Sequence, residues 1–128
     1  MSQRKRYKKR ADTWVTAVRL DLETDGFTYQ KWGALQTCKS GDWLVNNQGD
    51  TYTVDADSFA ETYREAGQGV YVKLTEIWAE VAQSAGTIKT KEGETHYQAG
   101  DYLVYNDAAG KDGYAVEKCV FDSQYEPC

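Results

Sequence analysis

The chain has little of several features that mark particular classes of protein. Its 128 residues include one proline, one histidine and one methionine. No apolar run approaches the roughly 20 residues that a membrane helix needs. The N-terminal MSQRKRYKKR has no apolar stretch behind its charges, so neither a membrane span nor a secretory signal is expected. A single histidine and the absence of any CxxC pair also argue against a structural zinc site.

Cysteine is scarce as well, and its placement bears on the cellular compartment. Cys38, Cys119 and Cys128 are odd in number and unmatched in spacing. We interpret all three as reduced thiols, which is the usual state in a reducing compartment. The protein is therefore predicted to be cytoplasmic.

What the chain does contain favours a globular protein rich in β-structure. Hydrophobic residues make up 41% of the chain, which is enough for a core at this length. Ten Tyr, four Trp and three Phe favour strands over helices. Residues 1–128 are predicted to form a single domain.

The most informative pattern is an internal repetition of residues 6–66 in residues 70–126. Four blocks match in the same order: RYKKRADTW with VYVKLTEIW, GALQT with GTIKT, GDWLV with GDYLV, and TYTVDADSFAETY with GYAVEKCVFDSQY. Length differences fall around DLETDGFTYQK, EGETHYQ and DAAGKDG, which we expect to be loops. The segment Gly67-Gln68-Gly69 is predicted to be a short linker between the copies.

Each copy is predicted to combine a strand, hairpins and a short closing helix. TWVTAVRL, ALQTC and TIKTK alternate as strands do. Glu92-Gly93 predicts the turn of one hairpin, and NNQGD predicts the turn of another between WLV and YTV. Because a unit of about 60 residues is marginal alone, we expect an α+β, β-rich fold. In it, the two copies pack pseudo-symmetrically around a shared core.

The closing helices follow from capping and spacing signals. DADSFAETYREAG predicts a helix with Asp55 or Asp57 as N-cap, and with Phe59 and Tyr63 facing inward. Phe121 and Tyr125 recur at the same spacing in the second copy, where Pro127 is predicted to truncate the helix.

The repeated motifs resemble a family of small uncharacterised proteins common in phages, prophages and bacterial genomes. Members typically begin with a run like KYRKKPVVVEAVQ and end with one like LEGxxxxxPGDYIIxGxxGExYPCKPDIFEKTYE. Here the opening is RYKKRADTWVTAVR and the ending is KEGETHYQAGDYLVYNDAAGKDGYAVEKCVFDSQYEP. The first copy carries the same ending as KSGDWLVNNQGDTYTVDADSFAETYR. The resemblance implies a duplicated form of the family's unit and a phage or mobile-element origin, and it carries over no site residue.

The repeated Gly-Asp pairs are the first candidates for a ligand site. Asp42 and Asp101 stand at matched positions, each followed by an aromatic residue, Trp43 and Tyr102. His96 in the predicted hairpin is a further candidate. The alternative interpretation of each Gly-Asp pair is a turn, where Gly permits unusual backbone angles and Asp bonds its own backbone.

The basic N-terminal run is a candidate for nucleic-acid association. It consists of Arg4, Lys5, Arg6, Lys8, Lys9 and Arg10, six of the fifteen basic residues. The rest of the chain holds nine basic and twenty acidic residues, a balance of −11, whereas a nucleic-acid binder usually presents a broad basic face. Two alternative interpretations remain: the run is a solvated leading segment, or it is the first strand, because it aligns with VYVKL.

The leading functional hypothesis is a non-enzymatic binding or protein-interaction module. Its partner is predicted to be a protein or a small ligand, and no motif indicates a cofactor or a metal. Nucleic-acid association through the basic run is the first alternative. The second is a small enzyme without a recognisable motif, for which His96 and Cys119 would be a base and a nucleophile.

Overall fold

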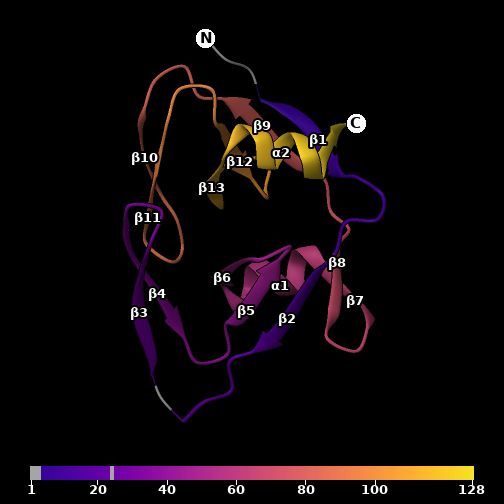
Figure 1. Cartoon of the computed structure of the whole chain (residues 1–128), viewed down its shortest axis with the longest axis vertical. Helices are drawn as coiled ribbons and strands as arrows, with labels where there is room; N and C mark the ends of the chain where they lie inside the picture. Colours follow the sequence, from indigo (N-terminus) through magenta and orange to yellow (C-terminus); the bar gives the residue numbers. More distant parts are fainter. Residues whose placement is uncertain (1–3, 24) are drawn as a thin grey trace.

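The computed structural model describes residues 4–23 and 25–128, and these residues form a β-rich α+β protein with two short helices (Figure 1). No helix in this part of the chain is long and apolar enough to cross a membrane. The strands are β1 (Lys5–Lys9), β2 (Val15–Arg19), β3 (Gly26–Lys31), β4 (Ala34–Lys39), β5 (Trp43–Asn47), β6 (Asp50–Val54), β7 (Tyr63–Gly67), β8 (Val70–Lys73), β9 (Ile77–Val81), β10 (Gly86–Lys89), β11 (Glu94–Tyr97), β12 (Tyr102–Tyr105), β13 (Gly113–Val116) and β14 (Tyr125–Pro127). The helices are α1 (Ala56–Thr62) and α2 (Lys118–Gln124).

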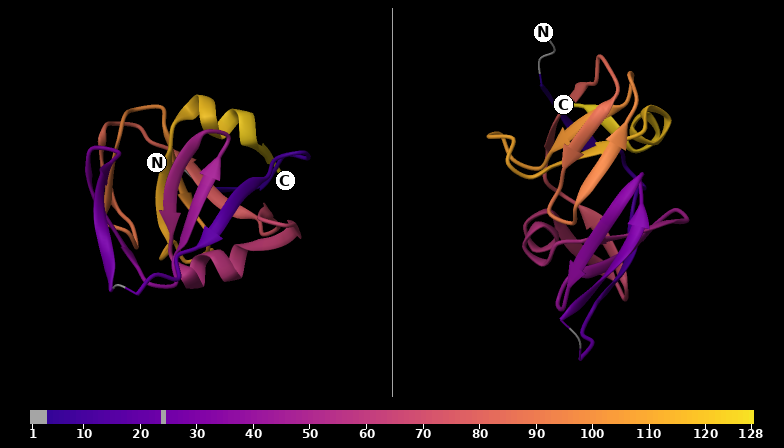
Figure 2. Two further views of the ribbon diagram at one scale, coloured as in Figure 1. Left: turned by 60° about the horizontal axis from the view of Figure 1, so that its bottom comes forward. Right: turned by 90° about the vertical axis from the view of Figure 1, so that its left-hand side faces the viewer.

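Ten of these strands form two antiparallel sheets of five. The first sheet has the strand order β6-β5-β2-β8-β7, and the second sheet has the order β13-β12-β9-β1-β14. The second sheet lies above the first in Figure 1. The remaining four strands form two hairpins, β3–β4 and β10–β11. The hairpins lie one above the other in the right view of Figure 2.

Each sheet takes one inner strand from the other half of the sequence. β1 lies in the second sheet between β9 and β14, and β8 lies in the first sheet between β2 and β7. Tyr7 of β1 is opposite Ile77, and Tyr71 of β8 is opposite Val15. The segment Gly67-Gln68-Gly69, expected as a linker, is the turn of the β7–β8 hairpin.

The strand registers correct one of the sequence alignments. The blocks RYKKRADTW and VYVKLTEIW match Trp14 with Trp78. In the structure, however, Val15 has the position in the first sheet that Ile77 has in the second. Trp78 therefore corresponds to Thr16, which lies opposite Val70 as Trp78 lies opposite Arg6. The reason is length: five residues connect β1 to β2, whereas three connect β8 to β9.

The first helix begins as expected and ends earlier. Asp55 is the N-cap, and its carboxylate accepts from the backbone N–H groups of Asp57 and Ser58. Phe59 is buried, but the predicted continuation through Tyr63 to Gly67 is wrong, because Tyr63 already has extended backbone and begins β7. The Tyr63 ring nevertheless stacks on Phe59, with 4.7 Å between ring centres.

The second helix repeats this geometry. Its N-cap is Glu117, which makes no side-chain capping bond, and Phe121 is buried. Tyr125 has extended backbone and stacks on Phe121 at 4.8 Å. Pro127 lies in the edge strand β14, where its missing N–H is tolerated.

The hairpins differ from the sequence-based expectation in one respect. DLETDGFTYQK was expected to be a loop, but its second half forms β3, which pairs with β4 along its whole length. Trp32 and Gly33 both have positive φ at the turn, as a two-residue hairpin turn requires. GALQT consequently lies on the second strand of its hairpin and GTIKT on the first strand of the other, so that block match is wrong as well.

The buried apolar residues divide into two clusters instead of one shared core. One cluster centres on Val15, Val45 and Phe59 beneath the first sheet. The other consists of Ile77, Ala79, Val104, Phe121 and Tyr125 in the second sheet and α2. The contact between the sheets is made largely by tyrosine and polar side chains.

Candidate functional site

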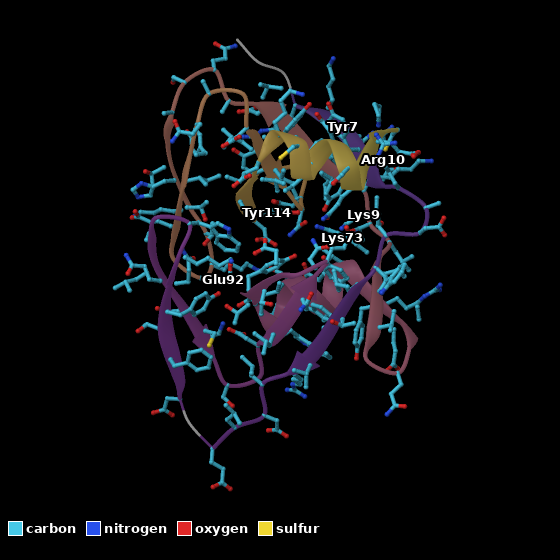
Figure 3. The ribbon with its side chains drawn as sticks, viewed as in Figure 1. Tyr7, Lys9, Arg10, Lys73, Glu92 and Tyr114 are labelled. Carbon is cyan, nitrogen blue, oxygen red and sulfur yellow. The ribbon has the colours of Figure 1, made fainter. Side chains whose placement is uncertain are left out.

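The junction between the two sheets holds buried lysine side chains among tyrosines. The ammonium of Lys73 donates to the Tyr114 hydroxyl at 2.7 Å, which joins β8 in the first sheet to β13 in the second. The Lys9 ammonium donates to Gln124 Oε1 at 2.7 Å and lies 5.1 Å from the centre of the Tyr125 ring. Figure 3 shows Lys9, Lys73 and Tyr114 between the sheets.

Burial shifts the pKa values of these groups. It lowers the pKa of Lys73 to about 7 and that of Lys9 to about 8, because a buried ammonium loses its hydration. Burial raises the pKa of Tyr52 to about 12 and that of Tyr125 well above its usual value. Lys73 is only 8% exposed, so its amine is out of reach of a dissolved substrate. The cluster is placed to hold the sheets together.

A second set of polar contacts joins the halves near the hairpins. Glu92 Oε2 accepts from the backbone N–H of Asp55 at 2.9 Å, and burial raises the pKa of Glu92 to about 7. The Lys91 ammonium donates to Ser58 Oγ at 2.8 Å, and this hydroxyl donates to Asp112 at 2.7 Å. These contacts tie the β10–β11 turn and the loop before β13 to the N-terminus of α1.

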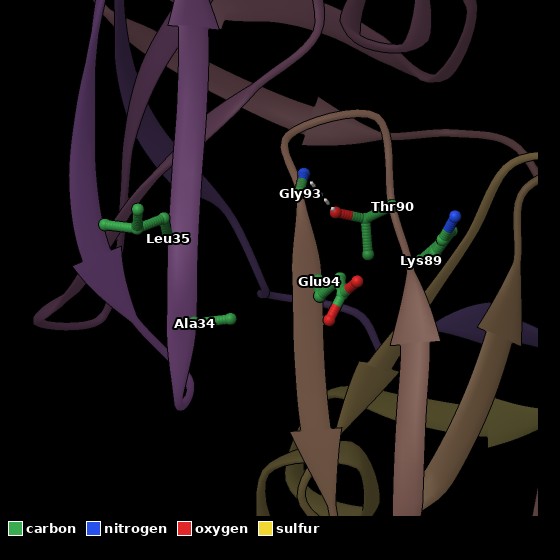
Figure 4. Close-up of a pocket in the computed structure, with 6 residues that line it drawn as sticks. All are labelled: Ala34, Leu35, Lys89, Thr90, Gly93 and Glu94. Carbon is green, nitrogen blue, oxygen red and sulfur yellow. Dashed lines mark hydrogen bonds between the residues drawn. The ribbon is translucent and has the colours of Figure 1, made fainter.

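An open cavity of about 420 Å³ lies between the two hairpins (Figure 4). Beside it, the buried Gln36 amide donates to the carbonyls of Lys31 and Glu94, which bridges β4 to β11. The charged groups of the cavity are a single amine and a single carboxylate. The lining residues are Ala34, Leu35, Lys89, Thr90, Gly93 and Glu94.

The outer face of the first sheet carries exposed apolar side chains. Val15 and Ala17 of β2 pack inward, so Thr16 and Val18 point outward. Val18 is 57% exposed; Trp14, directly before β2, is 53% exposed, and Leu22, three residues after β2, is 54% exposed. We call Trp14, Thr16, Val18 and Leu22 the outer stripe.

No helix in the described part of the chain covers the outer stripe. In the left view of Figure 2, β2 and β5 lie toward the viewer and neither helix is drawn in front of them. Trp14 and Thr16 line a shallow hollow of about 280 Å³ together with Asn46 of β5.

The matching face of the second sheet carries Trp78 at the place of Thr16, together with two ion-paired glutamates. Val18 lies opposite Leu44 as Glu80 lies opposite Leu103, so Glu80 occupies the place of Val18. Glu80 pairs with Arg4 at 3.5 Å. Glu76, four residues before Glu80, pairs with Arg6 at 3.3 Å. The fold therefore accommodates charge at these places.

The two aspartates predicted as ligands hold turns and helix ends. Asp42 is 1% exposed, and its carboxylate accepts from the backbone N–H groups of Lys39 and Ala56. Asp101 accepts in the same way from Gln98 and Lys118. Each aspartate thus joins the turn before its strand to the first residue of the following helix.

The structure does not bring the other predicted ligand residues together. Trp43 stacks on Phe59 at 4.2 Å, and Tyr102 stacks on Phe121 at 3.9 Å, so each packs in a different core cluster. His96 is exposed on β11, and its backbone N–H donates to Trp32. Cys119 is an exposed residue of α2, and His96 belongs to a hairpin.

The basic run forms β1 and the residues beside it. Arg4, Arg6 and Arg10 lie within salt-bridge distance of Glu80, Glu76 and Glu126. Lys9 is half-buried at the junction and donates to Gln124. Of the six predicted nucleic-acid contacts, only the exposed Lys5 and Lys8 make neither a salt bridge nor a side-chain hydrogen bond with another described residue.

Sequence reasoning did not single out the junction residues Lys73, Glu92 and Tyr114. The sequence does contain a signal for Lys73, because Lys9 matches Lys73 when RYKKRADTW is aligned with VYVKLTEIW. A solvent-exposed lysine would be free to differ between the two blocks. Glu92 had no such signal, since it was expected at a hairpin turn. Among the described residues, no group of three or more His, Cys, Asp or Glu side chains is placed to hold a metal ion.

Comparisons of the chain with protein-family models, with curated proteins and with solved structures found no match.

Proposed function

We propose that this protein is a non-enzymatic interaction module that binds a protein partner through the outer stripe of its first sheet. The observation that carries the proposal is the exposure of Trp14, Val18 and Leu22, each more than half exposed, on an uncovered sheet face. Exposed apolar patches of this kind mark interaction sites more often than they serve the fold.

The comparison with the second sheet strengthens this argument. Glu80 stands at the place of Val18 and is compatible with the same strand pairing. Packing within the sheet therefore does not require an apolar residue at position 18. A tryptophan and two aliphatic side chains are suited to the centre of an interface, where aromatic anchors contribute most of the binding energy.

Site-specific photocrosslinking in the cells that carry the gene tests the proposal. A crosslinking amino acid at position 18 is expected to capture a defined protein, and one at Val120 on α2 is expected not to. Val120 is a matched control because it is exposed and apolar but lies away from the stripe. Equal capture at both positions, or none at position 18, contradicts the proposal.

The alternatives have less structural support. Nucleic-acid association through the basic run competes with the salt bridges of Arg4, Arg6 and Arg10. A small enzyme would need a nucleophile and base that meet, whereas His96 and Cys119 lie on different elements. Binding of random DNA that weakens steeply with salt would favour the first alternative.

We further propose that the two halves are copies of one unit packed about a pseudo-two-fold axis, as the resemblance to the phage and bacterial family implies. Corresponding strands take the same places in the two sheet orders. The two helices have equal length and end on stacked Tyr63 and Tyr125. Lys9 and Lys73 face these tyrosines across the pairs β1–β14 and β8–β7.

A further inference from the structure

We infer that the partner of the outer stripe presents an apolar centre flanked by basic side chains, and that it is not a second copy of this chain. The inference rests on the proposed function, because it assigns the chemistry of the partner to the same surface. It is carried by the charges at the two ends of the stripe.

Both ends of the outer stripe are acidic. Asp12 lies beside Trp14 and lines the same hollow. Asp21 and Glu23 flank Leu22 at the other end, and all three carboxylates are exposed. None of the three forms a salt bridge with another described residue, so their charges are free for an external cation.

The chain's own basic residues are largely engaged elsewhere. Arg4, Arg6 and Arg10 pair with glutamates of the second half, and Lys39 and Lys91 both contact Asp55. The charge balance over residues 11–128 is −11. A basic partner is therefore attracted to the molecule at long range, and the two acidic ends orient it on the stripe.

A second copy of the chain would bring like charges, not opposite ones, to the ends of the stripe. If two stripes stacked antiparallel, Asp12 of one chain would approach Asp21 and Glu23 of the other. If they stacked parallel, like ends would meet, which again brings carboxylates together. Both arrangements bring carboxylates of the two chains together at an apolar contact, and like charges in an interface oppose association.

A short peptide of alternating lysine and leucine is the probe for the test. It presents leucines on one face and carries basic charge, and its binding to the full-length protein is followed by chemical-shift changes in NMR. We expect the changes to centre on Val18 and its neighbours. The control peptides replace leucine by serine, or lysine by glutamate, and each is expected to bind at least about tenfold more weakly.

Two protein variants localise the effect. Val18→Glu, which copies the residue at the matching place of the second sheet, is expected to weaken binding at least about tenfold. Val120→Glu, the control, is expected to leave it unchanged. Neutralising the end at Leu22 with Asp21→Asn and Glu23→Gln is expected to weaken binding and to reduce its dependence on salt.

Three results would overturn the inference. The first is binding of the lysine–leucine peptide that is insensitive to Val18→Glu. The second is a dimer in analytical ultracentrifugation that Val18→Glu dissociates. The third is a partner, crosslinked at position 18, whose contact surface is acidic or uncharged. This third result leaves the proposed interaction function intact, whereas failure of all crosslinking at position 18 removes both.

Discussion

Replacing Lys73 by methionine is expected to stabilise the protein below neutral pH. Lys73 is 8% exposed and lies between the two sheets. The groups around it are Lys9, Asp112 and the rings of Tyr63, Tyr114 and Tyr125. Methionine has a similar shape and flexibility but no charge, so the substitution removes the ammonium without opening a large void.

The size of the effect follows from the pKa. Burial lowers the pKa of Lys73 from 10.5 to about 7, which corresponds to a cost of about 5 kcal/mol for keeping this lysine protonated in the folded state. The substitution also removes the hydrogen bond to the Tyr114 hydroxyl, which costs about 1 kcal/mol. At a pH of about 6 we therefore expect Lys73→Met to raise the free energy of unfolding by about 3 to 4 kcal/mol.

The sign of the pH dependence is opposite to that of a lysine in an ordinary salt bridge, whose pKa is raised in the folded state. Between the folded pKa near 7 and the unfolded value of 10.5, the unfolded chain holds a proton on Lys73 that the folded chain has released. The free energy of unfolding therefore rises with pH across this window. Lys9, with its pKa lowered to about 8, contributes in the same direction. The variant should lose the Lys73 part of this rise and retain the Lys9 part.

Urea denaturation of wild type and variant from about pH 6 to about pH 9.5 measures both quantities. Lys111→Met, at an exposed lysine, is the matched control and should shift neither curve. If Lys73→Met destabilises by the same amount at every pH, the lysine acts as a hydrogen-bond donor only. A wild-type stability that is flat above pH 7 would show that Lys73 is not held in a desolvated place, and the reasoning would fail.

Three further predictions concern other contacts. Burial raises the pKa of Glu92 from 4.5 to about 7, so in this pH window the folded state retains a proton that the unfolded state has released, and the free energy of unfolding falls as pH rises. Glu92→Gln should remove this fall. Its persistence in urea denaturation of the variant would refute the prediction. Phe59→Ala and Phe121→Ala should each cost about 3 to 5 kcal/mol, and calorimetry should show one transition in each variant; a second transition would indicate independent halves. Asp42→Asn should cost about 1 to 3 kcal/mol and more than Asp101→Asn, since the Asp42 carboxylate is buried and also contacts the Lys39 ammonium; equal melting temperatures would contradict this.

Local signals in the sequence were sufficient for much of the secondary structure. The hairpin turns at Glu92-Gly93 and in NNQGD follow from turn chemistry, and both are present. Phe59 and Phe121 were recognised as buried because their spacing recurs while the residues between them change. The β-rich α+β class is confirmed by the same elements.

Two features depended on the tertiary structure and were not predictable from local pattern. α1 ends at Tyr63 because Tyr63 pairs with Lys73 of β8. No residue near Tyr63 in the sequence indicates this pairing. The alignment of Trp14 with Trp78 matched identical residues and ignored a two-residue difference in connection length. Only the sheet registers reveal that Ile77 is the partner of Val15.

The candidate site illustrates the same division. Asp42 and Asp101 are predicted as ligands because they stand at matched positions in the sequence. The structure shows that both carboxylates stabilise turns and helix ends instead. The sequence pattern does not indicate the outer stripe as a site, because its residues are not repeated at matching positions. Val18 and Glu80 occupy matching places in the two sheets with opposite character. A difference between the two sheets at such a place indicates a role separate from folding.

The exchanged strands explain why the two apolar clusters are expected to unfold together. β1 is an inner strand of the second sheet and β8 an inner strand of the first, and each is continuous with a strand of the other sheet through a connection of five or three residues. Unfolding of the first half therefore withdraws β1 from between β9 and β14, which leaves the backbone groups of both neighbours unpaired. It also exposes Tyr7, which packs edge-on against Phe121 at 4.9 Å. The second cluster thus loses part of its own cover whenever the first one opens, so we expect two clusters separated by a polar junction to unfold as a single cooperative unit.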